Sequence, residues 1–351
     1  MNLDGVEKIA EAVLYEGYML YPYRRSSVKN QQRWNFGVLS PQSYCEQQQG
    51  SEAWMMQTEC LLKATAETRL SVKVRFLEIV QRSIGKLRVP GQERPEGEEP
   101  EFDLVDHLEA CGRLFQPWQE AVEREHFSTM PAIRSLVSVY PVRLTFPGGK
   151  QFEYLRDEQG RAMGVVVREW EALTASVQLD AKPCPDGVVK LTVRIRNLTS
   201  FDCFENARRE DALPFSMISS HTILGVEQGE FVSLLDPPLG LEAVAAQCEN
   251  IGTWPVLIGD QSQTVLSSPI ILYDHPQIAP ESAGNFFDAT EIDEILSLRI
   301  LALSDEEKRE MQQSDDRARE ILERTESMPA EQFMKLHGVL RGLTPDREEA
   351  R

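Results

Sequence analysis

Two neighbouring segments with period-two alternation constrain the fold of this chain most. Apolar residues occupy every second position over 173–179 and again over 189–195, with polar residues between them. Side chains two positions apart lie on the same face of a strand, so each segment predicts a half-buried strand. The intervening Lys182–Gly187 carries two prolines and an Asp-Gly pair, which favour a turn. We therefore predict an antiparallel β-hairpin in the middle of the chain.

Further strand patterns flank this hairpin. Leu70–Phe76 alternates like the hairpin strands, and Val137–Phe146, Gly164–Val167, Val232–Leu235 and Thr264–Tyr273 are rich in strand formers. Several short strands separated by turns are typical of an antiparallel sheet system. The expected fold class is α+β, with an antiparallel β-sandwich-like centre, a short N-terminal helix and a helical acidic C-terminal tail.

Helical patterns stand at both ends of the chain. Apolar residues recur with helical spacing over 4–21, and Pro22 ends that helix because it cannot extend the hydrogen-bond ladder. We also expect helix over 101–127 and over 240–248. In the tail, Thr290 and the capping box Ser304–Glu307 predict helix starts, and Pro329 precedes a last helix with Phe333, Leu336, Val339 and Leu340 on its apolar face.

These patterns divide the chain into four parts. Residues 1–89 hold the N-terminal helix and strands, and residues 90–100 are rich in Pro, Gly and Glu, which predicts an acidic, mobile linker. Residues 101–280 form a β-rich domain that could share one sheet system with 1–89. Residues 281–351 form a helical C-terminal segment.

Charge and composition exclude several classes of protein. The 351 residues carry a net charge of −19, which disfavours contact with a phosphate backbone, so we expect no nucleic-acid partner. No apolar run approaches the roughly 20 residues that cross a bilayer, and the N-terminus lacks a signal-peptide pattern. We expect a cytoplasmic protein without membrane insertion.

The six cysteines do not suggest a zinc or redox site. None lies within two to four residues of another, so zinc-knuckle and Cys-x-x-Cys spacings are absent. In a cytoplasmic chain such cysteines are expected to be reduced thiols. We accordingly expect no cofactor, and the sequon at Asn197–Thr199 is then a chance match.

One basic and aromatic segment contrasts with the charge of the whole chain. No acidic residue occurs between Glu16 and Glu46, whereas Arg24, Arg25, Lys29 and Arg33 lie there and Trp34 follows. Guanidinium groups bind carboxylates and phosphates bidentately, so these five residues form a candidate site for a protein partner or an anion. The alternative is internal pairing with the acidic linker or tail, which is the usual arrangement of basic clusters in acidic chains.

A second candidate site contains histidine and carboxylate residues. His221, Asp236 and His275 could assemble a metal site, although their spacing matches no known ligand motif. The chain also lacks a nucleophile elbow and a phosphate-binding glycine loop. The sequence offers no positive sign of enzymatic activity.

Several blocks of sequence resemble a family of uncharacterised accessory proteins associated with [NiFe]-hydrogenase gene clusters. The first is Val13–Arg24, continued by Lys29-Asn30, Arg33-Trp34 and Phe36-Gly37. The others are Ser219–Val226, Phe231–Pro238, Gly252–Val256, Leu266–Pro276 and Phe287–Leu296.

This resemblance spans most of the chain and implies an accessory role without a known reaction. It leads to the hypothesis of a non-enzymatic protein that assists a [NiFe] hydrogenase by assembly, docking or stabilisation, with a hydrogenase subunit or maturation factor as partner. One alternative is a metal-binding protein or metal-dependent enzyme built around His221 and His275. Another is an anion- or nucleotide-binding module that uses the basic segment.

Overall fold

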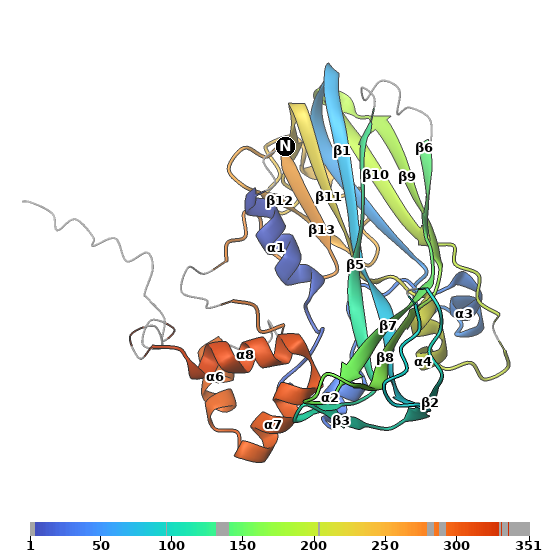
Figure 1. The fold of residues 1–351 in the computed structure, drawn as a ribbon. Coiled ribbons are helices and arrows are strands. Elements are labelled where there is room, and N and C mark those ends of the chain that lie inside the picture. The colour runs from blue at the N-terminus through green and yellow to red at the C-terminus, as the bar shows by residue number, and fades with distance from the viewer. Residues whose placement is uncertain are drawn as a thin grey trace, which may run out of the picture. The chain divides into compact units, whose positions relative to one another are not determined.

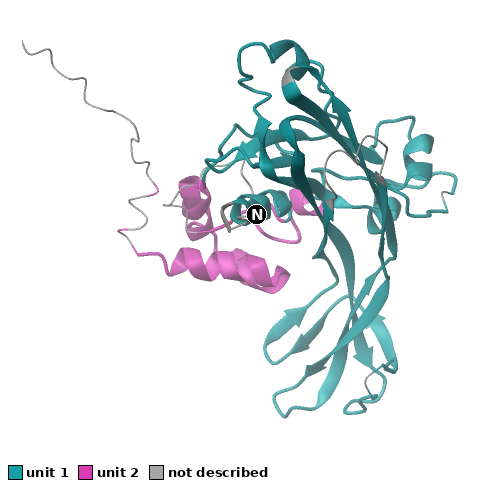
Figure 2. Ribbon diagram, turned by 90° about the horizontal axis from the view of Figure 1, so that it is seen from above, with its two compact units in different colours: residues 1–18, 32–277 teal, residues 19–31, 278–351 magenta. Residues whose placement is uncertain are grey.

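The protein has a mixed α+β fold with mostly antiparallel strands in one large sheet and helices near both ends of the chain (Figure 1). The computed structural model describes residues 4–95, 97–130, 140–202, 204–278, 284–287, 293–329, 331 and 336. The described part of the chain forms two compact units (Figure 2). Unit 1 comprises Met1–Tyr18 and Gln32–Gln277, and unit 2 comprises Met19–Gln31 and Ile278–Arg351.

Eleven strands of unit 1 belong to one hydrogen-bonded sheet, whose main path runs β12-β13-β11-β1-β10-β9-β6. Strands β2, β5 and β8 also pair with β1, β7 pairs with β8, and β3 and β4 form a separate two-stranded sheet. The strands are β1 Met55–Leu87, β2 Phe102–Val105, β3 Leu108–Ala110, β4 Arg113–Phe115, β5 Trp118–Met130, β6 Tyr140–Phe146, β7 Gly149–Arg156, β8 Ala162–Trp170, β9 Leu173–Pro183, β10 Val188–Asn197, β11 Ile218–Val232, β12 Trp254–Ile258 and β13 Thr264–Ser268.

Strand β1 organises this sheet because it is long enough to pair with several partners in succession. Its first part pairs with β10, from Met55 opposite Arg196. Its middle lies between β11 and β5, and its last residues pair with β8 and β2. The predicted segment Leu70–Phe76 is the central part of this strand.

The sheet curls around its main core. Phe76 of β1 and Phe146 of β6 meet edge to face with ring centroids 5.0 Å apart, although β10 and β9 lie between their strands. Three strand spacings would separate them by about 14 Å in a flat sheet. The curl brings the inward-facing rows of β1, β6, β9, β10 and β11 into one apolar cluster. The predicted hairpin supplies two of these rows, and β9 and β10 confirm it.

Helices of unit 1 are short apart from the first. Helix α1 packs Val6, Ala10 and Val13 onto Ile223 of β11 and Leu266 of β13, as the helical spacing of its apolar residues requires. The helix ends at Leu14, earlier than the predicted limit at residue 21, and the next residues form turns. The helices of this unit are α1 Asp4–Leu14, α3 Gln42–Gln47, α4 Arg209–Ala212 and α5 Glu242–Ala245, with 3-10 turns at Pro185–Gly187 and Leu213–Phe215.

The prediction of helix over 101–127 is wrong. This stretch contains β2, β3, β4 and most of β5, which pairs with β1 from Trp118 opposite Arg82 to Met130 opposite Leu70. Its charged residues suit a strand here because β1 carries oppositely charged partners, including Arg75 for Glu123 and Glu78 for Arg124. These cross-strand ion pairs favour the strand conformation over the helix that the local pattern predicted.

Residues 90–100 connect β1 to β2, which pair antiparallel from Ile84 opposite Val105 to Leu87 opposite Phe102. Two acidic residues of this connection form ion pairs with β7: Glu93 with Arg156, and Glu99 with Lys150. The connection therefore joins two paired strands of one sheet.

Unit 2 combines residues 19–31 with the C-terminal helices. It contains α2 Val28–Gln31, α6 Asp293–Leu301, α7 Asp305–Ser314 and α8 Asp316–Glu326. The Ser304 side chain accepts a hydrogen bond from the Glu307 amide, which confirms the predicted capping box. Thr290, Phe333, Val339 and Leu340 lie outside the described residues, so the helix start predicted at Thr290 and most of the last predicted helix cannot be compared. No helix among the described residues is long and apolar enough to span a membrane.

Candidate functional site

The predicted metal ligand His221 is fully buried on β11. Its Nδ1 lies 2.9 Å from the Ser219 carbonyl oxygen, which assigns the proton to Nδ1. The other ring nitrogen, Nε2, is buried and has no hydrogen-bond partner within the described part of the chain. Burial lowers the pKa of this imidazole to about 4, and the charges of Arg75 and Lys73 contribute to the decrease. The ring is therefore neutral at pH 7.

The other two members of the predicted metal set lie at a different place in unit 1. His275 is exposed, and its backbone N–H donates to the Leu257 carbonyl oxygen at 2.7 Å. The Asp236 amide donates to Ser233 Oγ at 2.8 Å, and that hydroxyl donates to Asp274, the residue before His275.

The structure thus joins the Asp236 and His275 loops through Ser233 and leaves His221 among other charges. The residues whose charges act on His221 are Arg75, Lys73 and Glu123. Throughout the described ranges, no group of three or more His, Cys, Asp or Glu side chains could hold a metal ion.

The basic segment is divided between the two units. Arg24 of unit 2 contacts two carboxylates of α7, with Nη1 at 3.2 Å from Glu307 and 3.8 Å from Glu310. The Arg25 backbone donates to Ser314 Oγ, and Lys29 is exposed on α2. Within unit 2, therefore, the Arg24 side chain is paired with the acidic tail, and the Lys29 side chain is exposed.

Arg33 and Trp34 belong to unit 1 and form part of an aromatic cluster. The Arg33 guanidinium carbon lies 4.3 Å from the centroid of the Trp34 ring and 3.9 Å from that of Trp118, with Tyr18 at 5.3 Å. Arg33 also donates to the carbonyl oxygens of Tyr18 and Gln119. Only 3% of Arg33 is exposed, so cation–π contacts and carbonyl groups hold its charge inside the fold.

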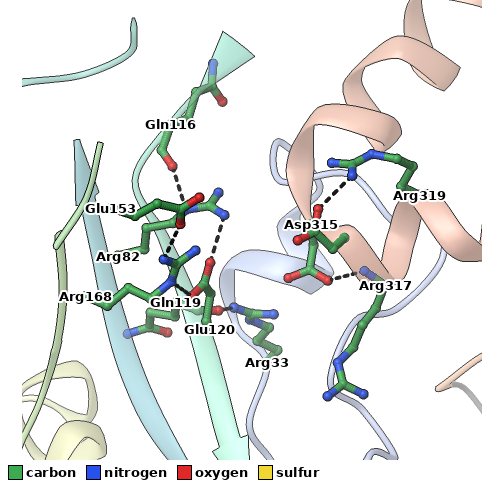
Figure 3. Close-up of polar contacts among 11 residues, drawn as sticks. Arg33, Arg82, Gln116, Gln119, Glu120, Glu153, Arg168, Asp315, Arg317 and Arg319 are labelled. Carbon is green, nitrogen blue, oxygen red and sulfur yellow. Dashed lines mark hydrogen bonds and ion pairs between the residues drawn. The ribbon is translucent and has the colours of Figure 1, made fainter. Parts of the chain in front are cut away.

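A bridging carboxylate lies close to this cluster on β5 (Figure 3). Glu120 accepts from Arg82 of β1 at 2.9 Å and from Arg168 of β8 at 2.6 Å, and Arg168 also donates to Glu153 of β7. These ion pairs link four strands. The role of these contacts is therefore structural, because they hold neighbouring strands of the sheet together.

A groove with apolar walls lies in unit 1 beside the start of β1. One lobe has a volume of about 600 Å³ and the other about 360 Å³, and the two are adjacent because Glu52, Ala53 and Met55 line both. We call them together the tryptophan groove. Its walls include Glu46, Gln49, Trp54 and Ile251 in the larger lobe, and Phe36, Gly37, Arg209, Gly252, Trp254 and Pro269 in the smaller one.

Large apolar side chains of this groove face solvent. Trp254 is 43% exposed and Ile251 is 44% exposed. The connection from Pro269 to Asp274 leads from the groove to β12 and carries Ile271 and Tyr273, which are 72% and 86% exposed. Exposed large apolar side chains that line a groove, such as Trp254 and Ile251, are typical of an interaction site.

Backbone contacts fix the walls of the tryptophan groove. Leu39 and Met217 exchange hydrogen bonds of 2.9 and 3.1 Å, and Gln57 and Ile251 exchange bonds of 3.0 and 2.9 Å. Gly37 has φ +53°, and a Cβ there would lie 2.6 Å from Pro269 Cγ, so only glycine allows this approach of the two walls.

Asn197 anchors the same region from inside. Its Nδ2 donates to the carbonyl oxygens of Leu39 and Phe215 at 2.8 Å each, and the residue is fully buried. Asn197, the first residue of the sequon, thus has a structural role.

Sequence reasoning did not select the groove residues. Trp54 and Ile251 belong to no motif, and the other residues of the groove walls come from distant parts of the chain. A usable signal was the set of blocks that carry the family resemblance, because Phe36-Gly37, Gly252–Val256 and Leu266–Pro276 each contribute wall residues. Comparison with known proteins adds no relative: no family model matches the chain, and a search of curated proteins gave no match.

Proposed function

We propose that this protein is a non-enzymatic accessory protein that acts with a [NiFe] hydrogenase, through assembly, docking or stabilisation of a subunit or maturation intermediate. The tryptophan groove is the observation that carries the proposal. It presents exposed Trp254 and Ile251 on a framework fixed by hydrogen bonds, as a docking surface requires. In this proposal the curled sheet is a sandwich-like scaffold that holds the groove in shape.

The family resemblance described above indicates the type of partner, a hydrogenase subunit or maturation factor. Three of its blocks, far apart along the chain, supply walls of the same groove. This convergence supports a shared binding role for these blocks. We further propose that the partner is a protein, that nucleic acid is not bound, and that the protein acts in the cytoplasm without inserting into a membrane.

The two alternative functions have weaker support. A metal site would need ligands that converge, whereas His221 is buried among Arg75, Lys73 and Glu123, away from the exposed His275 loop. An anion or nucleotide site would need available cations, whereas Arg24 contacts Glu307 and Glu310, and Arg33 is enclosed by aromatic rings.

Affinity purification of the tagged protein under native conditions, from cells that make the hydrogenase, tests the proposal. We expect hydrogenase subunits or maturation factors to be recovered, and deletion of the gene to lower hydrogenase activity. Recovery of no hydrogenase component, together with unchanged activity after deletion, would overturn it. Elemental analysis of protein purified without chelators tests the metal alternative, which requires a stoichiometric transition metal.

A further inference from the structure

The tryptophan groove is preformed, which determines the kind of ligand it can bind. The bridges at Leu39–Met217 and Gln57–Ile251 hold its walls to the sheet, and Gly37 packs directly on Pro269. A rigid groove loses little conformational entropy when a ligand binds, so ordering of the groove costs little binding free energy. A short flexible segment of a partner is therefore a suitable occupant, because the groove supplies the order that the segment lacks.

The shape of the groove favours an extended segment with bulky apolar side chains. Its two lobes are adjacent and share Glu52, Ala53 and Met55 as lining residues. Trp54 and Ile251 line the larger lobe, and Trp254 lines the smaller one. Two adjacent lobes suit two apolar anchors on one chain, since alternate side chains of an extended segment point the same way.

The charges at the groove favour basic residues beside those anchors. Glu46 and Glu52 line the larger lobe, and burial together with these carboxylates raises the pKa of the adjacent Cys45 thiol to about 11. Arg209, a cation on the groove wall, is already 3.5 Å from Glu52 and donates to the Trp34 carbonyl oxygen. Because Arg209 neutralises Glu52, the negative charge that is available to a positively charged ligand in the larger lobe is that of Glu46, which accepts a hydrogen bond from the neutral Gln42.

A second copy of this chain is a poor candidate for the occupant. A symmetric contact through the groove would place Glu46 and Glu52 of one copy against the same carboxylates of the other. Each chain also carries a net charge of −19, so the two copies repel one another. Charge complementarity therefore selects a basic segment of a different protein.

We propose that the tryptophan groove binds an extended peptide segment of the partner that carries one or two bulky apolar residues flanked by Lys or Arg. This inference rests on the proposed accessory function and specifies the part of the partner that is bound. The apolar anchors occupy the two lobes, and the basic flanks pair with Glu46 and the larger lobe. Specificity then comes from the combination of apolar and positive groups.

Selection from a random dodecapeptide phage library on the immobilised full-length protein tests this inference. We expect enrichment of sequences in which Trp, Phe, Leu or Met lies beside Lys or Arg. A fluorescein-labelled peptide synthesised from the consensus should bind in fluorescence anisotropy, and Trp254→Ala with Ile251→Ser should weaken it at least tenfold. Glu46→Lys should weaken it too, because this carboxylate has only Gln42 as its hydrogen-bond partner within the described chain.

Matched controls separate the groove from the general surface. Leu239→Ala removes an apolar side chain that is 98% exposed elsewhere, and Glu98→Lys reverses an exposed charge in the β1–β2 connection. Both should leave peptide affinity within twofold, and all variants should retain the wild-type melting temperature within a few degrees. The inference is overturned by failure to enrich any sequence, by enrichment of acidic sequences, or by equal binding to the groove variants and the wild type.

The purification experiment distinguishes this inference from the accessory function itself. If the Trp254→Ala, Ile251→Ser variant still recovers hydrogenase components, the groove assignment is wrong and the accessory function remains. If the wild type selects basic peptides and recovers no hydrogenase component, the groove assignment stands and the accessory function is wrong.

Discussion

Arg33 and His221 are polar side chains buried inside unit 1. Their surroundings explain why Arg33 is charged whereas His221 is neutral. Arg33 keeps its charge because two carbonyl oxygens and three aromatic rings replace water. His221 has one hydrogen bond, to Ser219, and Arg75 lies opposite it on β1. A second positive charge is unfavourable there. The sequence identified both residues as site candidates, and the packing shows how the charge of Arg33 is stabilised and why His221 is neutral.

The depressed pKa of His221 predicts a loss of stability on acidification. The imidazole has a pKa of about 4 in the folded protein against 6.5 for the exposed group. The unfolded chain therefore binds a proton first, and this stability is present above pH 6.5 and lost as the pH falls toward 4. Between pH 7.5 and 4.5 the loss should be about 2–3 kcal/mol.

Urea unfolding at a series of pH values measures this loss in the wild type and in His221→Gln. Carboxylates contribute equally to both proteins, so the difference between the two curves isolates the histidine. Parallel curves over this pH range would contradict the assignment.

The enclosed guanidinium predicts that Arg33→Lys is not a conservative change. Lysine keeps the positive charge but cannot stack its planar group against Trp34 and Trp118 or donate in the same fork to Tyr18 and Gln119. We expect a loss of about 2–4 kcal/mol in the free energy of unfolding, measured by chemical denaturation. The exposed Lys29 serves as the control, since Lys29→Ala should change stability by less than about 0.5 kcal/mol. An unchanged midpoint for Arg33→Lys would argue for a surface role.

At the scale of elements, local patterns predicted the strands whose two faces differ and failed where long-range pairs decide. Leu173–Leu179 and Val189–Ile195 could be read from alternation because one face is polar and the other is in the core. The strand β5 could not be predicted in this way, because the ion-pair partners of its Glu120, Glu123 and Arg124 lie on β1 and β8. The tryptophan groove could likewise not be predicted from the sequence, since its walls meet only after the sheet forms.

The capping box of α7 gives a prediction at this scale. Ser304→Ala removes the acceptor for the Glu307 amide and should cost about 1 kcal/mol, concentrated in the first turn of the helix. Amide hydrogen exchange should be faster over Asp305–Arg309, and Ser304→Thr should restore it because the hydroxyl is retained. Equal exchange in wild type and Ser304→Ala would show that packing alone fixes this helix start.

At the scale of the whole molecule, the excess of negative charge is partly neutralised inside each unit. The β1–β2 connection pairs with β7 in unit 1, and α7 pairs with Arg24 in unit 2. The remaining charge still dominates the long-range field of a chain at −19. Such a field accelerates encounters with basic ligands and is screened by salt.

This field predicts salt-dependent binding of the basic consensus peptide. The association rate constant should fall by about tenfold between 50 and 500 mM NaCl, while the dissociation rate changes less. Stopped-flow anisotropy measures both. A peptide with the same apolar anchors and neutral flanks is the control and should show little dependence on salt. Equal salt dependence of the two peptides would contradict electrostatic steering.

The composition of unit 2 also has a consequence for protein synthesis. Residues 19–31 leave the ribosome early, yet the groups that Tyr23 and Arg24 contact, at Phe286, Glu307 and Glu310, are translated near the end. The nascent chain must therefore carry this basic, aromatic stretch without its final contacts while almost all of unit 1 is made. During that interval it is accessible to chaperones, so the order of translation determines when the segment is sequestered.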